Sequence, residues 1–133
     1  MDEKDKDALA RAAFQTLVDV AYILSNVDFQ RAVWIFGNHP RHYISSFDET
    51  IEMFQENLEW LIQDDLWRRM LTQDQITALR GLYSQVELFD HGKRGLDPRA
   101  IVGDPGWAAI VSSAKEALAK LVVNGCHIHP SIA

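Results

Sequence analysis

The sequence of 133 residues contains a single cysteine, Cys126. One cysteine excludes a disulfide within the chain and a zinc site built from several cysteines. Seven glycines and four prolines are also too few for a collagen-like or disordered chain. A chain of this length without paired cysteines fits a reducing compartment, so we expect a cytoplasmic protein with its own hydrophobic core.

Long apolar runs are missing as well. Residues 1–7 are almost all charged, which is unlike the start of a secretory signal. The longest apolar stretches, such as residues 18–24, are too short to span a bilayer. We therefore expect no membrane segment.

Basic residues are scarce relative to acidic ones. Thirteen Lys and Arg stand against 19 Asp and Glu, which gives a net charge of −6. A general nucleic-acid binder needs a basic face, so we expect no direct contact with nucleic acid. The charge is also uneven, because residues 48–65 contain seven acids and neither Lys nor Arg.

What the sequence does contain is helical periodicity. Apolar residues recur at three- and four-residue steps across residues 8–27, which predicts an amphipathic helix. A shorter, mostly apolar helix is predicted between Asp28 as its N-cap and Gly37 as its stop. It includes Trp34 and is expected either to be deeply buried or to belong to an interface.

The later helices are predicted from their capping signals. Ser46 and Glu49 form a capping-box pattern for a helix that reaches about Gln63. Thr72 and Gln75 repeat this pattern for the next helix. Two Asp-Pro pairs, 97–98 and 104–105, predict a short turn over residues 99–102 and a last long helix that ends at residues 124–125.

These patterns predict an all-α protein without a convincing strand. We expect one domain spanning residues 1–133, an irregular bundle of five to six helices, four of them long. A charged N-terminal tail, residues 1–7, and a C-terminal arm, residues 126–133, are expected to flank it.

The strongest functional signal lies on the predicted third helix. Glu49, Glu52, Glu56 and Glu59 fall within about 80° of one another, opposite the apolar stripe. Like charges at this spacing repel, and the helix offers no Lys or Arg to relieve them. A solvated face and a carboxylate cluster for a metal are two explanations. The third is a docking surface for a basic protein.

Two large side chains on the same helix favour docking. Met53 and Trp60 lie outside the apolar stripe and border the glutamates, as does Asn57. Tryptophan is enriched at binding hot spots and methionine suits adaptable contact surfaces. The alternative is that Trp60 packs under a neighbouring helix. The predicted partner-binding residues are Glu49, Glu52, Met53, Glu56, Glu59 and Trp60.

No cofactor, metal or catalytic residue is predicted. The histidine pairs 39/42 and 127/129 each lack an obvious third ligand. Cys126 adjoins His127, but neighbouring side chains of an extended chain point apart. We therefore lean away from an enzyme.

Three functional hypotheses follow. The first is a small acidic protein-binding module, most concretely an inhibitor or antitoxin-like immunity protein that covers a basic nuclease toxin. The second is a small-molecule or metal-binding bundle, possibly an enzyme, that uses His39, Arg41, His42 and Tyr43. The third is a homo-oligomeric module, such as a homodimer, with the apolar helix around Trp34 as its seam.

Overall fold

The periodic segments of the sequence form helices in the computed structural model, which describes residues 2–37, 46–63, 65, 71–93 and 97–121. This part of the chain is 89% helical and has no strand, which confirms the all-α prediction. The elements are α1 (Glu3–Ser25), α2 (Val27–Gln30), the π-helical turn η1 (Arg31–Ile35), α3 (Phe47–Gln63), α5 (Gln73–Lys93), α6 (Pro98–Val102) and α7 (Pro105–Leu121).

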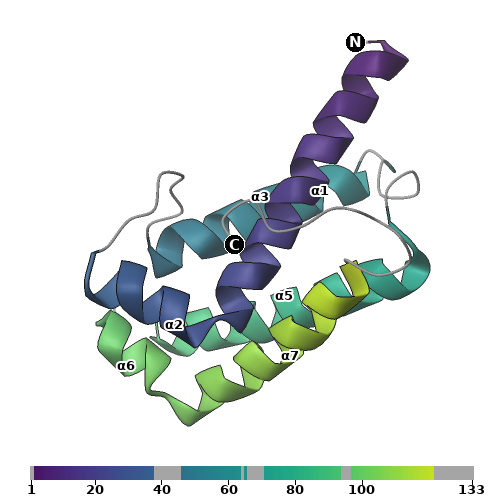
Figure 1. Ribbon diagram of the computed structural model, residues 1–133. Coiled ribbons are helices and arrows are strands. Elements are labelled where there is room, and N and C mark those ends of the chain that lie inside the picture. Colours follow the sequence, from purple (N-terminus) through teal and green to yellow (C-terminus); the bar gives the residue numbers. More distant parts are fainter. Residues whose placement is uncertain (1, 38–45, 64, 66–70, 94–96, 122–133) are drawn as a thin grey trace.

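The four long helices form the body of the molecule. Helices α1 and α5 each lie beside both α3 and α7, and successive long helices run in opposite directions (Figure 1). This is the up-and-down connectivity of many four-helix bundles. The short elements α2, η1 and α6 gather at one end, and the N-terminal turns of α1 project beyond the other helices (Figure 1).

The core is closed at one end by a group of aromatic rings. Trp107 of α7 is fully buried, and its ring lies 5.3 to 5.9 Å from those of Trp34, Phe47 and Phe89, centroid to centroid. Each such contact contributes about 0.5–1.5 kcal/mol beyond the burial of its area. The rings join η1, α3, α5 and α7, so the aromatic group holds the short elements on the bundle.

A buried glutamine ties α1 to α7. Gln30 is 0% exposed, and its Nε2 donates to the carbonyls of Ile23, at 2.8 Å, and Leu24, at 3.1 Å. Its Oε1 accepts a 2.8 Å hydrogen bond from Trp107 Nε1. Carbonyls in the last turn of a helix have no partner within that helix, so Gln30 completes the end of α1.

Helix α1 begins at Glu3, five residues before the predicted start at residue 8. Asp2 is its N-cap, and the Asp2 carboxylate accepts a 2.9 Å hydrogen bond from the backbone N–H of Asp5. The acids of the first turn also favour a helix N-terminus electrostatically. These residues have no apolar periodicity, so their helical signal lay in capping and charge alone.

The start of the second helix is two residues earlier than predicted. Asn26, and not Asp28, is the N-cap, since Asn26 Oδ1 accepts a 3.0 Å bond from Phe29 N. The π-helical turn that follows was not predicted. Gly37 adopts φ +72°, a left-handed conformation that glycine tolerates and that suits a helix stop.

The other predicted N-caps are confirmed, and the predicted helix stop at residues 124–125 lies outside the described residues. Ser46 Oγ accepts from Glu49 N at 3.0 Å, and the carboxylates of Asp97 and Asp104 accept from backbone N–H groups at the starts of α6 and α7. Thr72 and Gln75 exchange two hydrogen bonds of 2.8 and 3.2 Å. The predicted C-terminal arm, with Cys126, lies outside the described residues.

Helix α1 is long and apolar enough, by length and composition, to cross a membrane. However, 56% of its most apolar stretch is buried inside the protein. The core helix of a soluble protein meets the same criteria, and here the buried side of α1 packs on α3 and α7.

Candidate docking surface on helices α1 and α3

The predicted carboxylate row lies on the outer face of α3. Glu52, Glu56 and Glu59 are exposed, and Glu49 in the first turn is half-buried. The opposite face of the helix is in the core and consists of Phe47, Thr50, Ile51, Phe54, Leu58 and Leu61. The helix has neither Lys nor Arg, so no cation within α3 offsets the row. Below, this row of four glutamates is called the carboxylate face.

The negative field of this face extends to α5, which sequence reasoning missed. Tyr83 of α5 packs against Phe54, with ring centroids 5.4 Å apart. Burial raises the pKa of Tyr83 above its usual 10.0, and Glu87, Glu59 and Asp90 raise it further. Glu59 of α3 and two acids of α5 therefore act on the same phenol.

The other flank of α3 faces α1. Met53 and Trp60 are half-buried and pack against the core, and Asn57 Nδ2 donates a 2.8 Å hydrogen bond to the Met53 carbonyl. Trp60 is thus neither a fully exposed anchor nor a fully buried core residue. One part of the ring packs against the core, and the rest remains accessible.

A hollow of about 180 Å³ lies between these two helices. The hollow is lined by α1 (Leu9, Ala12, Ala13, Thr16) and by α3 (Asn57, Trp60). Among these residues, Leu9 is 42% exposed. Small side chains at two adjacent positions of α1 leave the gap. Below, it is called the α1–α3 hollow.

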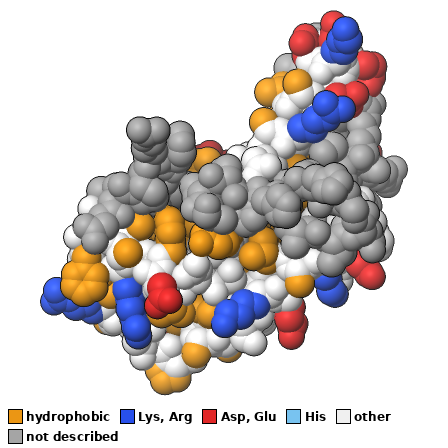
Figure 2. All heavy atoms as spheres, in the orientation of Figure 1, with side chains coloured by type: hydrophobic (Ala, Val, Ile, Leu, Met, Phe, Trp, Pro, Cys, Tyr) orange, Lys and Arg blue, Asp and Glu red, His pale blue; other side chains and the backbone are white. Residues whose placement is uncertain are grey.

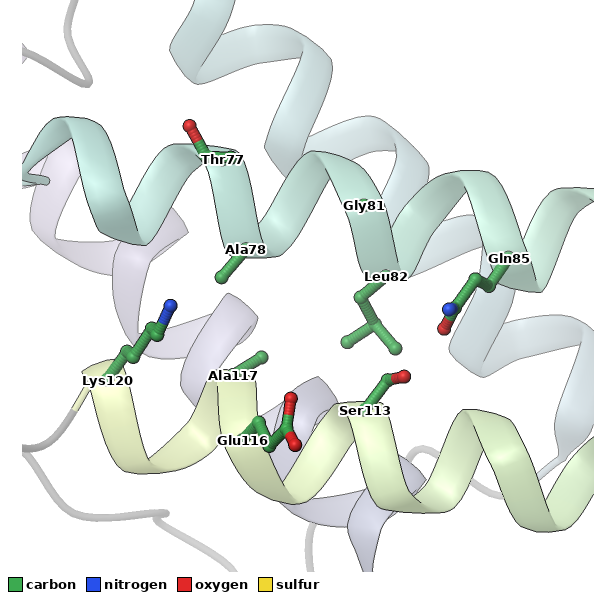
Figure 3. Close-up of a pocket in the computed structure, with 9 residues that line it drawn as sticks. All are labelled: Thr77, Ala78, Gly81, Leu82, Gln85, Ser113, Glu116, Ala117 and Lys120. Atoms are coloured by element: carbon green, nitrogen blue, oxygen red, sulfur yellow. The ribbon is translucent and has the colours of Figure 1, made fainter.

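A second hollow of about 180 Å³ lies between α5 and α7. Figure 3 shows its lining from both helices: Thr77, Ala78, Gly81, Leu82 and Gln85 of α5, and Ser113, Glu116, Ala117 and Lys120 of α7. Glu116 and Lys120 have opposite charges, so this hollow favours neither sign of ligand. Both hollows are smaller than typical small-molecule pockets, which are roughly 300–1,000 Å³.

The residues of the alternative hypotheses are placed as follows. No three His, Cys, Asp or Glu side chains among the described residues are grouped to hold a metal ion. His39, Arg41, His42, Tyr43 and the histidines at 127 and 129 lie outside the described residues. Trp34, proposed as an oligomer seam, is only 7% exposed and packs on Phe47 and Trp107 of the same chain.

Figure 2 shows that acidic and basic side chains are mixed on the projecting end of α1. By contrast, every charged residue of α3 is acidic. Comparisons with protein families, with curated proteins and with solved structures found no match to this chain.

Proposed function

We propose that this protein is a protein-binding module that docks the carboxylate face of α3 on a basic protein. The observation that carries the proposal is the exposure of Glu52, Glu56 and Glu59 on a helix without a single basic residue. Each like-charge pair costs a few tenths of a kcal/mol in the free protein. A basic partner removes that cost and adds attraction.

The most concrete form of this function is an inhibitor or immunity protein for a nuclease toxin. A nuclease has a positive surface that binds the negative phosphates of nucleic acid. A row of carboxylates is negative as well, so it can bind to the same surface. Complementary charge accelerates association and favours the correct partner over others. The attraction between exposed charges weakens as salt rises, since the Debye length falls from about 10 Å at 0.1 M to about 3 Å at 1 M.

The test is affinity capture with identification of the captured protein, using three baits. They are the wild type, a Glu52→Lys/Glu56→Lys double variant, and a Glu116→Lys/Asp74→Lys double variant. The third is a matched control, because it makes the same change in net charge at exposed positions of α7 and α5.

We expect wild type and the control to retain the same basic protein, and moderate salt to release it. The α3 double variant should lose it. Retention by all three baits would show that the docking face lies elsewhere, and an acidic or neutral captured protein would contradict the proposal.

A further inference from the structure

We propose that the α1–α3 hollow receives one apolar side chain, phenylalanine or leucine, from a basic segment of the partner. This inference rests on the proposed function and adds what that function leaves open, the side chain by which the partner is anchored. The partner segment is expected to carry this side chain about one helical turn from a lysine or arginine.

The size of the hollow argues for a single side chain. Its volume of about 180 Å³ is close to that of an apolar protein cavity of about 150 Å³ that holds benzene. It is smaller than the pockets that hold drug-sized ligands, which are roughly 300–1,000 Å³. One aromatic ring or one leucine side chain therefore matches the available space.

The chemistry of the lining is mostly apolar. Leu9, Ala12, Ala13 and the Trp60 ring supply carbon surface. The Thr16 hydroxyl donates to the Ala12 carbonyl at 3.0 Å, so its donor capacity is already used. The exposed fraction of Leu9, 42%, means that the surface remains available to a partner.

A negative charge, as a basic partner segment requires, lies next to this apolar surface. Glu56 is exposed and precedes Trp60 by four residues, so their Cβ atoms are about 5–6 Å apart on the helix. Asn57 supplies a polar group as well. Its Nδ2 is engaged by the Met53 carbonyl, which leaves Oδ1 to accept from a partner donor. The hollow between α5 and α7 has no preference for a basic partner, because the acidic Glu116 and the basic Lys120 both line it.

The experiment uses the full chain labelled with ¹⁵N and two synthetic helical peptides of lysine and alanine. One peptide has a central phenylalanine, and in the other that residue is alanine. Affinity is measured together with the NMR shifts of backbone amides and of the Trp60 indole N–H, which is assigned with Trp60→Phe.

We expect the phenylalanine peptide to bind about tenfold or more tightly than the alanine peptide, because burial of a phenylalanine side chain supplies that factor. Both peptides should shift amides around Glu52 and Glu56. Only the phenylalanine peptide should shift Leu9, Thr16 and the Trp60 indole.

Two variants sharpen the test. Ala12→Leu fills the hollow from an exposed position of α1, and Ala109→Leu is the matched control at an exposed position of α7. We expect Ala12→Leu to bind both peptides with equal affinity, at the level of the alanine peptide. Ala109→Leu should retain the full preference for phenylalanine.

The outcomes separate this inference from the proposed function. Equal binding of the two peptides by the wild type overturns the inference and leaves the function standing. A preference that persists in Ala12→Leu, or shifts confined to the hollow between α5 and α7, also overturns the inference. If neither peptide binds, both proposals fail.

Discussion

At the scale of single residues, the buried polar side chains of the core differ in whether their hydrogen-bonding atoms have partners. Gln30 uses both ends of its amide, and its Oε1 must be the atom facing Trp107 because an indole N–H can only donate. Trp34 offers the contrast, since its buried Nε1 has no hydrogen-bond partner within the described structure. One aromatic group thus contains a satisfied and an unsatisfied indole.

Gln30→Met should lower the free energy of unfolding by about 2–4 kcal/mol. The change keeps the side-chain volume but leaves Trp107 Nε1 and the Leu24 carbonyl without their bonds to Gln30. Urea denaturation measures the loss. Gln85→Met, at an exposed site on α5, should stay within about 0.5 kcal/mol of wild type. A similar value for both variants would show that the buried network contributes little.

The two tryptophans should respond differently to the same substitution. Trp107→Phe removes a donor that Gln30 needs, whereas Trp34→Phe removes a donor that has no partner. We therefore expect Trp107→Phe to cost roughly 1–3 kcal/mol more than Trp34→Phe. Paired urea curves would decide, and equal costs would indicate that ring volume alone controls this end of the core.

At the scale of elements, short-range signals account for most helix boundaries. Thr72 and Gln75 satisfy each other's backbone N–H groups at the start of α5. Gln75 Nε2 also donates a 2.9 Å bond to the Lys120 carbonyl of α7, 45 positions away. A capping signal visible in the sequence thus acquires a second role that links two helices.

Thr72→Ala should destabilise the protein by about 1 kcal/mol, because it removes the N-cap acceptor of α5. Amide hydrogen exchange should show faster opening of the first turn of this helix. Thr77→Ala, one turn further along and exposed, is the control and should change stability by no more than about 0.5 kcal/mol. A loss in Thr77→Ala equal to that in Thr72→Ala would contradict the capping explanation.

On α3, Glu56→Lys should separate folding from binding. The new lysine follows Glu52 by four residues, the favourable order for a helical ion pair, and should raise the free energy of unfolding by about 0.3–1 kcal/mol at low salt. Binding of a basic partner should weaken at the same time. If Glu56→Lys lost both stability and binding, repulsion within the carboxylate face would not be what lowers the stability of the free protein, and this explanation would be refuted.

At the scale of the whole molecule, acids from two helices act on one phenol. Burial is the largest cause of the raised pKa of Tyr83, followed by Glu87, Glu59 and Asp90. Since the folded state holds this proton more tightly than the unfolded state, the resulting stability is present below the ordinary pKa of 10.0. It is lost as pH rises through the higher folded pKa.

We therefore expect the stability of the wild type to fall as pH rises above about 10, and more steeply than that of Tyr83→Phe. Urea curves at a series of alkaline pH values measure this slope. Glu59→Gln should lower the Tyr83 pKa, observed through tyrosinate absorbance, because one of the neighbouring charges is removed. If the Tyr83 titration were unchanged in Glu59→Gln, the charge of Glu59 would not act on Tyr83.

The sequence by itself determined the all-α class, the apolar stripes, most caps and the glutamate row on α3. These features depend on residues within about four positions of one another, where helical geometry alone decides which side chains share a face. The same rule misplaced the start of α1, because residues 3–7 carry capping and dipole signals without apolar periodicity.

Only the tertiary structure decided which helices are neighbours, and with that the site. The hydrogen bond between Gln30 and Trp107 spans 77 positions, and the α1–α3 hollow requires the small residues of α1 to meet Trp60 of α3. Contacts between distant segments arise from how several stripes pack together. No single stripe contains that information, because each is compatible with more than one neighbour.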